Sequence, residues 1–372
     1  EMNRSNRILP VYTGDVSGAC SALFELGGMV VIHDPSGCNS TYNTHDETRW
    51  YDHDSLIFIT GLTERDAILG NDDKLIHDVV STAQELRPRF IALCSSPIPW
   101  INGTDFMAIC RLIEQRTGIP CLHVQTNGMH DYVVGAGNAL AEVARRFVEP
   151  LPSKEQTVNI LGVTPLDYHA PDAADNLRQF CEQSGFTVTS CWAMGSTLDE
   201  LTRASEASVN LVVSATGLAT AKVLRNQFGT PFVVGTPFAV GADVTAFKPI
   251  LAQALQEAAV SKALVFPCRD VRAQHANGTH CLIGDPVICG SLAAAQELSG
   301  AAACRIICPT EASRELLAPC DIAADGEEEV EVALSRATFV MADPFYEAIL
   351  PARAELAPIP HLAFSGRNAL TY

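Results

Sequence analysis

The chain of 372 residues is poor in basic and aromatic side chains. It has 25 Lys and Arg against 43 Asp and Glu, which gives a formal net charge of −18, and aromatic residues make up only 7%. That much negative charge would repel a phosphate backbone, so we expect no nucleic acid partner. The sequence also has no apolar run of about 18 residues and no basic-then-apolar leader, so we expect no membrane association and a cytoplasmic protein.

Two common short motifs are also absent. No C-x-x-C occurs among the 13 cysteines, which argues against a zinc ribbon or a thioredoxin-type site. No G-x-x-x-x-G-K-[ST] loop occurs, so we do not expect the chain itself to hydrolyse ATP. In a cytosolic chain disulfides are improbable, so each thiol is either buried filler or a ligand. We expect five cysteines in apolar or helix-like stretches to be buried and chemically inert: Cys181, Cys191, Cys289, Cys304 and Cys308.

The pattern along the chain is strand, turn and helix, repeated. Its strands are near-continuous apolar runs without alternation, which a parallel sheet covered on both faces requires. We therefore predict an α/β protein with three Rossmann-like domains in series, each a mainly parallel sheet covered by helices. The predicted domains span 1–154, 155–262 and 263–372. A proline-bearing polar stretch at 149–156 is the first linker, and "ALVFPC" at 263–268 is the first expected strand of the third domain.

Three cysteines of the first domain lie in turn-rich stretches. Cys20 lies in "GDVSGACSAL", Cys38 in "HDPSGC" and Cys94 in "IALCSSPIPWINGTD". Each is next to glycine, serine or proline, which expose backbone and let a bulky inorganic ligand approach. Ligands in open α/β sheets bind beyond the carboxyl ends of the strands. The spacings form no short local motif, so the residues alone leave open that these are three unrelated cysteines in turns.

A resemblance to a known family adds to this pattern. "VVIHDPSGC" resembles the H-G-P-x-G-C segment of the nitrogenase component 1 family. "GLTERDAILGNDDKLIHDV", "RPRFIALCSSPIPWINGTD" and "GIPCLHVQTNGMHDYVVGAGNAL" resemble later family segments in the same order, and the likeness extends over residues 10–365. The chain is similar to a short nitrogenase-like member of this family.

The resemblance implies a metal site. Cys20, Cys38 and Cys94 match the three cysteines that hold the family's bridging iron–sulfur cluster, a [4Fe-4S] or larger P-cluster-like group, so 1–154 would be an iron–sulfur cluster-binding domain. Thiolates suit iron because they are soft, strongly donating ligands. Three ligands from one chain cannot complete a cluster that needs four or more. A second copy or a paralogous partner would supply the rest, so the resemblance implies a dimer with the cluster shared between its two chains.

The resemblance also implies a function. The chain would be an oxidoreductase, the catalytic component that takes electrons from a separate ATP-hydrolysing iron–sulfur reductase. It would pass them through the interface cluster to a small-molecule substrate, which the sequence does not identify: tetrapyrroles, sulfur compounds and other small molecules all stay open. The alternative is a non-catalytic scaffold on which an iron–sulfur cluster or metal cofactor is assembled. A third possibility is a partner subunit that has lost its cluster.

Several residues depart from the family pattern or stay ambiguous. Asp34 replaces a family glycine and is either an extra carboxylate near the cluster turn or a turn-capping residue. Ser214 falls where dinitrogen-reducing subunits have the cysteine that anchors their iron–molybdenum cofactor, so we expect neither that cofactor nor dinitrogen reduction. His361 is expected to be structural. The stretch 45–54, with His45, Asp46, Glu47, Asp52, His53 and Asp54, could line a cavity or hold a metal, but a solvated acidic loop is favoured.

Overall fold

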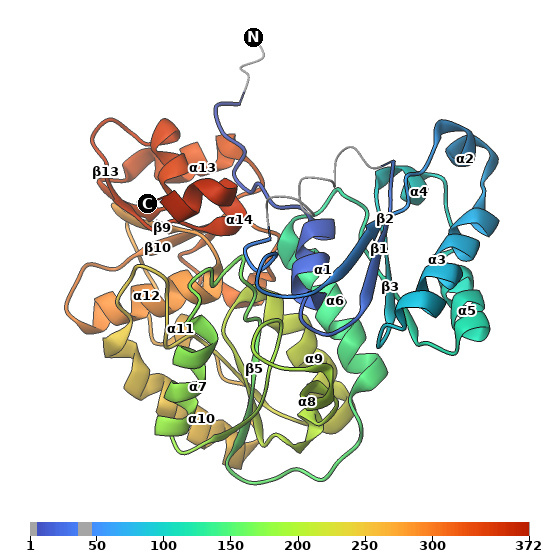
Figure 1. Ribbon diagram of the computed structural model, residues 1–372. Coiled ribbons are helices and arrows are strands. Elements are labelled where there is room, and N and C mark those ends of the chain that lie inside the picture. The colour runs from blue at the N-terminus through green and yellow to red at the C-terminus, as the bar shows by residue number, and fades with distance from the viewer. Residues whose placement is uncertain (1–5, 36–46, 372) are drawn as a thin grey trace.

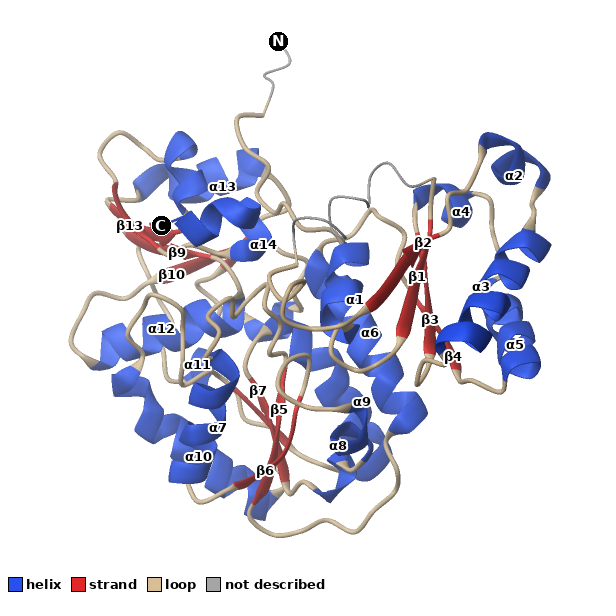
Figure 2. Ribbon diagram, viewed as in Figure 1, coloured by secondary structure: helices blue, strands red, loops and turns tan. Residues whose placement is uncertain are grey.

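The computed structural model describes residues 6–35 and 47–371, and its strands form three separate sheets (Figure 1, Figure 2). All pairings between the named strands are parallel. Helices cover the sheets, as the continuous apolar strands require. The predicted α/β class with three Rossmann-like units is confirmed.

The first sheet has the strand order β2-β1-β3-β4. Its strands are short apolar segments: β1 (Met29–His33), β2 (Leu56–Ile59), β3 (Ile91–Ser95) and β4 (Cys121–Val124). Alternate residues of these strands face two different cores. One face packs against α1 (Asp15–Leu23) and α6 (Tyr132–Phe147), and the other packs against α3 (Asp72–Leu86) and α5 (Phe106–Thr117).

Two helices of the first sheet form where the sequence predicts them. The helix α3 spans "DDKLIHDVVSTAQEL", a stretch whose apolar residues recur at helical spacing. The helix α5 begins after Asp105, whose carboxylate accepts a hydrogen bond of 3.0 Å from the Ala108 amide. It ends at Gly118, which has a φ of +71° that glycine adopts without strain.

The second sheet has the order β6-β5-β7-β8 and the third has the order β11-β10-β9-β12-β13. The strands of the second are β5 (Thr157–Leu161), β6 (Thr187–Cys191), β7 (Val209–Val212) and β8 (Phe232–Val234). Those of the third are β9 (His280–Ile283), β10 (Arg305–Cys308), β11 (Ile322–Ala323), β12 (Phe339–Ala342) and β13 (Glu355–Pro358). The longer helices here are α7 (Ala173–Gln183), α9 (Leu218–Phe228), α10 (Lys248–Ser261) and α12 (Pro286–Leu298).

The expected strand at 263–268 is wrong. Only Val265 pairs, through a single parallel bridge to Val233 of the second sheet, and α11 (Pro267–Asp270) follows directly. Pro267 has no amide hydrogen to donate to a strand ladder, and its fixed φ suits the first turn of a helix. The three sheets lie within the predicted domain ranges, and the exact boundaries stay a prediction.

The two ends of the described chain lie close together. The amides of Tyr12 and Thr13 donate to the carbonyl of Ala363, at 3.1 and 3.0 Å. Next to them, Gly14 forms an antiparallel bridge with Asp131, just before α6 (Figure 1). The segment that leads into α1 therefore joins the first sheet's helices to the C-terminal part of the chain. Among the described helices, none combines the length and apolar character needed to cross a bilayer.

Candidate functional site

Two of the three predicted cysteine ligands lie side by side. Cys20 is in α1 and Cys94 is in β3, where it pairs with Ile32 of β1, and both side chains are fully buried. The largest influence on the Cys20 thiol is its hydrogen bond with the Cys94 thiol. Together with burial, it raises the pKa of the Cys20 thiol well above its usual value. The Cys20 thiol is therefore protonated when no metal is bound, and metal binding would displace its proton.

Close helix packing positions Cys20. A Cβ atom added at Gly135 of α6 would lie 1.8 Å from the Asp15 carbonyl oxygen, and one added at Gly18 of α1 would lie 2.4 Å from the Tyr132 carbonyl oxygen. No larger residue fits at either position. These glycines let α1 approach α6 closely over the sheet, which places Cys20 beside Cys94.

The predicted third ligand, Cys38, lies outside the described residues, but the start of its turn is well defined. The carbonyl of His33 accepts a hydrogen bond of 2.9 Å from Ser96, just after β3. The backbone of the next residue, Asp34, is held by Thr60 and Leu62 at the end of β2. Asp34 is buried. The chain therefore leaves β1 at the carboxyl edge of the sheet, next to the end of β3.

A buried ion-pair network lies beside Cys20. Arg49 donates to Glu47 at 2.7 Å and to Glu25 at 2.9 Å, and its guanidinium lies 4.7 Å from the centre of the Phe24 ring. The negative charge of Glu47 also acts on Cys20 and contributes to the rise of its pKa. The expectation of a solvated acidic loop is thus wrong for Glu47. It holds for Asp52, His53 and Asp54, which are exposed, while His45 and Asp46 lie outside the described residues.

The described residues bring together no group of three or more His, Cys, Asp or Glu side chains that could hold a metal ion. Cys20 and Cys94 supply two donors, and they suit iron because they are soft ligands shielded from water. The donor chemistry of this pair therefore fits an iron–sulfur cluster completed by further thiolates.

A second cluster of polar side chains lies where parts of all three sheets meet. The Tyr132 hydroxyl donates a hydrogen bond of 2.7 Å to Asp167 Oδ1, and Thr164 donates one of 2.9 Å to Asp167 Oδ2. His361 Nε2 lies 3.4 Å from Asp167 Oδ1, and its ring stacks on Phe364 with centroids 4.2 Å apart. His361 is thus placed beside a buried carboxylate, at the junction of the three sheets.

Asp285 belongs to the same junction. It caps α12 by accepting from the amides of Val287 and Ile288, at 2.9 and 3.0 Å, and it also accepts from the Ala215 amide at 2.9 Å. Burial, and then the charge of Asp167, raise the pKa of the Asp285 carboxyl to about 7. The surroundings of Asp285 therefore favour its protonated form more than water does.

Tyr132, Asp167 and Asp285 were not selected from the sequence. The available signal was their position, since Asp167 and Asp285 each follow the carboxyl end of a buried strand. The aspartate in "GDPV" also precedes a proline, a typical start of a helix. What the sequence lacks is a spacing that links the three residues, because they belong to parts of the fold that are built around three different sheets.

Ser214 has its own partners. Its hydroxyl donates to the carbonyl of Gly162 at 2.7 Å and lies 2.7 Å from the hydroxyl of Thr216. The side chain is fully buried. Ser214 therefore stabilises the turn after β5, and the expectation that it anchors no iron–molybdenum cofactor stays a prediction.

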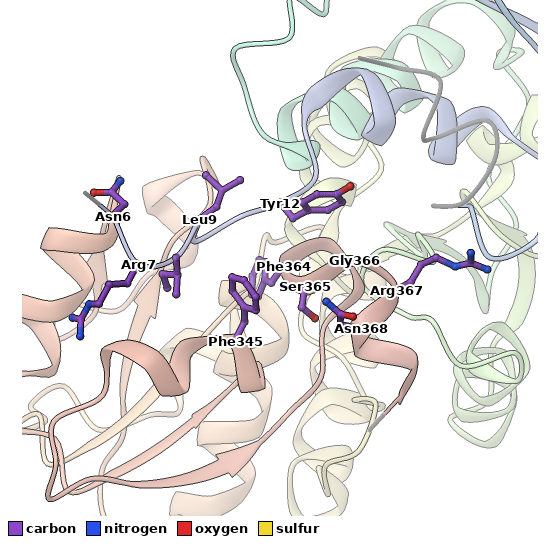
Figure 3. A pocket seen from close by; sticks show the side chains of 11 residues that line it. Asn6, Arg7, Leu9, Tyr12, Phe345, Phe364, Ser365, Gly366, Arg367 and Asn368 are labelled. Atoms are coloured by element: carbon purple, nitrogen blue, oxygen red, sulfur yellow. The ribbon is translucent and has the colours of Figure 1, made fainter. Parts of the chain in front are cut away.

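A cavity of about 700 Å³ lies between the N-terminal segment and the C-terminal end of the described chain (Figure 3). Tyr12 and Phe345 contribute aromatic rings to its wall. Arg7 at its edge is paired with Glu327 and Glu331. No cysteine is among its described lining residues, so this cavity is separate from the thiol pair.

Comparisons with known proteins show which family the chain resembles in sequence and in fold. The family model described as nitrogenase component 1 type oxidoreductase matches residues 15–338. The nitrogenase iron-molybdenum cofactor biosynthesis protein NifE of Clostridium pasteurianum is 25% identical over 239 residues, 59% of this chain and 51% of that protein. A light-independent protochlorophyllide reductase subunit of Prosthecochloris aestuarii is 32% identical over 232 residues, 60% of this chain and 42% of that protein.

The chain spans about half the length or less of these two curated relatives. A solved structure described as nitrogenase Cp1 at pH 6.5 has the same fold, with a TM-score of 0.66 at 16% identity over 96% of this chain and 88% of that one. The family match extends across strands of all three sheets and includes Cys20, Cys38 and Cys94. The chain therefore belongs to the family of nitrogenase component 1 type oxidoreductases.

Proposed function

We propose that the chain is the catalytic component of a two-component reductase. In this proposal, Cys20, Cys38 and Cys94 hold an iron–sulfur cluster that is completed by a second subunit. Electrons come from a separate ATP-hydrolysing iron–sulfur protein and pass through the cluster to a small-molecule substrate. The single observation that carries the proposal is the buried pair of Cys20 and Cys94 at the sheet edge from which the Cys38 turn departs.

The chain length available to Cys38 supports its role as a ligand. Cys38 follows Pro35 by three residues, and such a segment spans at most about 10 Å. Pro35 itself follows the end of β1, the strand that pairs with β3 at Cys94. This short reach along the chain supports the proposal that Cys38 is a ligand of the same cluster.

The residues around the thiols position them, shield them from water and balance the nearby charge. When bound, an iron–sulfur cluster accepts and releases electrons. Gly18 and Gly135 hold α1 in place, so that Cys20 keeps its position over β3. Burial of both thiols excludes water and oxidants from the site. Arg49 compensates the charge of Glu47, which would otherwise lie uncompensated in the interior near Cys20.

Exposed apolar side chains support the dimer. Ile68 and Leu69 of α2 (Glu64–Leu69) and Ile101 of α4 (Pro97–Ile101) are all exposed. The two helices are adjacent, because the side chain of Asn102 donates to the carbonyl of Ala67 at 2.8 Å. Helix α4 begins three residues after Cys94. We define Ile68, Leu69 and Ile101 as the α2–α4 patch and propose that a second copy or a paralogous chain covers it.

The alternative function is a scaffold on which a cluster or metal cofactor is assembled. The relatives include both kinds of protein, since one is a cofactor biosynthesis protein and the other belongs to a reductase. Both functions need the same thiols and the same interface. The buried carboxylates at the three-sheet junction favour the catalytic proposal, because reduction of most organic substrates consumes protons as well as electrons and Asp285 holds one near neutral pH.

Anaerobic iron and acid-labile sulfide analysis tests the cluster. We expect iron and sulfide in the purified protein, and loss of most of both in the Cys20→Ala, Cys38→Ala and Cys94→Ala variants. Cys181→Ala is the matched control, because Cys181 is equally buried in α7 and far along the chain from the proposed ligands. Full iron content in Cys38→Ala would contradict the proposal. Turnover that depends on an electron donor then separates a reductase from a scaffold, which binds and releases its cargo without catalysis.

A further inference from the structure

A second cavity, of about 430 Å³, opens at the carboxyl ends of β3 and β4. Ligands of open parallel sheets bind at this edge, and the volume is within the usual range for small-molecule sites. Its lining comes from the ends of both strands, from α4 and the segment after it, and from α6. The lining residues that the argument uses are Trp100, Phe106, His123, Gln125, Asn127 and Asn138.

One wall of this cavity is aromatic. Phe106 and His123 stack with ring centroids 5.1 Å apart and ring planes inclined by 15°. Burial lowers the pKa of His123, so its ring is neutral at physiological pH. Trp100 adds a third ring that is 53% exposed. Phe106 is buried and His123 is partly buried, so the exposed Trp100 ring and the His123 ring offer the surfaces on which a planar ligand can stack.

The lining also carries amide groups with open hydrogen-bonding capacity. The Gln125 carboxamide has no hydrogen bond to any described residue, and Asn127 uses only its oxygen, which accepts from the Met129 amide at 2.9 Å. Asn138 uses only its nitrogen, which donates to the Gln125 carbonyl at 2.9 Å. The cavity therefore presents at least one free amide donor and one free amide acceptor.

The cavity is also nearly free of charge. No Asp, Glu, Lys or Arg is among its described lining residues. Its one exposed ionisable group, His130, is paired with Glu311 at 3.0 Å. A charged ligand would lose its hydration here without gaining an opposite charge, so the chemistry selects against it.

From this geometry we propose that the cavity binds an uncharged, planar, fused heteroaromatic ring with amide-type donors and acceptors on its edge, as in flavins and pterins. The ring stacks on Trp100 and on the His123 ring, which Phe106 supports from behind, and its edge bonds to Gln125, Asn127 and Asn138. This binding does not depend on the cluster, because none of these side chains is a proposed iron ligand.

The test uses the purified protein under anaerobic conditions, with lumiflavin and 6-methylpterin as probes, since both rings are uncharged at neutral pH. Binding is followed by the change in probe fluorescence. We expect at least one probe to bind, and Trp100→Ala to weaken its binding about 10-fold, the usual effect of losing one stacking ring. Gln125→Ala is expected to weaken it several-fold through the lost hydrogen bond.

Two control variants separate the cavity from the general surface. Tyr51→Ala removes an exposed ring and Gln227→Ala removes an exposed amide, both outside the cavity, and neither should change probe affinity. Sedimentation of each variant checks that its assembly state is unchanged, and Gln125→Ala serves as the decisive variant if Trp100→Ala alters it. The proposal is overturned if neither probe binds, or if binding is the same in the decisive variant and in the controls. Either result leaves the iron analysis of the cysteine variants unaffected.

Discussion

The hydroxyl of Tyr132 donates a hydrogen bond of 2.7 Å to Asp167 Oδ1, and both side chains are buried. Tyr132 is the first residue of α6, which covers the first sheet, whereas Asp167 follows β5 of the second. The bond therefore joins two parts of the fold that are built around different sheets. A charged acceptor makes such a bond stronger than a bond between neutral groups.

Replacing Tyr132 by Phe should destabilise the protein by about 1–3 kcal/mol, because the ring stays but the buried carboxylate loses a donor. The urea midpoint, measured by circular dichroism, checks this prediction. Tyr51→Phe is the matched control, since the Tyr51 side chain is 85% exposed and its hydroxyl can bond to water in either state. An equal midpoint for both variants would show that Thr164 alone satisfies Asp167.

Asp285 should make stability depend on pH. Its pKa of about 7 in the folded protein exceeds the ordinary aspartate value of 3.8, so the folded state binds this proton more tightly than the unfolded state. The stabilising contribution is fully present below about pH 4 and is lost as the pH rises through about 7. Between pH 5 and pH 8 this loss amounts to roughly 2–3 kcal/mol.

The variant Asp285→Asn removes this titration. Its amide keeps a capping oxygen for α12 but replaces the oxygen that accepts from Ala215, so we expect it to be less stable than the wild type at pH 5. The gap should narrow by pH 8, where the wild type has lost its protonated form. Urea unfolding at both pH values measures this. Glu257→Gln, which alters an exposed carboxylate of α10, should keep the wild-type pH dependence, and a parallel pH profile for Asp285→Asn would refute the prediction.

Local patterns in the sequence were enough for most helices and buried strands. Continuous apolar runs such as 29–33 and 91–95 are typical of parallel strands, and the structure has β1 and β3 there. The short strands β11 and β13 carry little apolar signal in their two and four residues, and β2, although its four residues LIFI are all apolar, is too short for a run of this length to predict a strand. Their pairing is decided by the neighbouring strand in the sheet.

The candidate site could be predicted from the sequence only in part. The adjacency of Cys20 and Cys94 depends on how α1 packs over β3, which no local spacing encodes. Family resemblance supplied the connection, and the structure brings these two residues together. The pairing of Glu47 with Arg49 was missed although only one residue separates them, because burial decides whether an acidic stretch is solvated or ion-paired.

Ser214 leads to a prediction about metal content. Its hydroxyl is held by Gly162 and Thr216, and an alcohol is a poor substitute for a thiolate as an iron ligand. We therefore expect protein purified anaerobically from its own host to contain iron without molybdenum or vanadium, and to reduce no dinitrogen. Elemental analysis by mass spectrometry measures this. Stoichiometric molybdenum or vanadium would overturn the prediction.

The α2–α4 patch leads to the last prediction. Ile101 is 67% exposed at the end of α4, seven residues after Cys94, and Ile68 and Leu69 lie exposed on the adjacent helix α2. Three thiolates from one chain leave a cubane cluster incomplete, so the surface near these cysteines should be covered by another subunit. Obligate interfaces of this kind typically bury more than about 2,000 Å² with an apolar centre. The net charge of −18 does not oppose this, because charge can lie on the rim and on distal faces.

A charge placed in the centre of such an interface should weaken the dimer at least 10-fold, since burying an unpaired carboxylate costs more than about 1.4 kcal/mol. We expect Ile101→Glu to shift the protein toward monomer in anaerobic sedimentation velocity, and to lower its iron content as the shared ligands separate. Val260→Glu is the matched control, because Val260 is 85% exposed on α10, a helix of the second sheet. A monomer that kept its full iron content would refute the sharing of ligands, and a dimer unaffected by Ile101→Glu would place the interface on another surface.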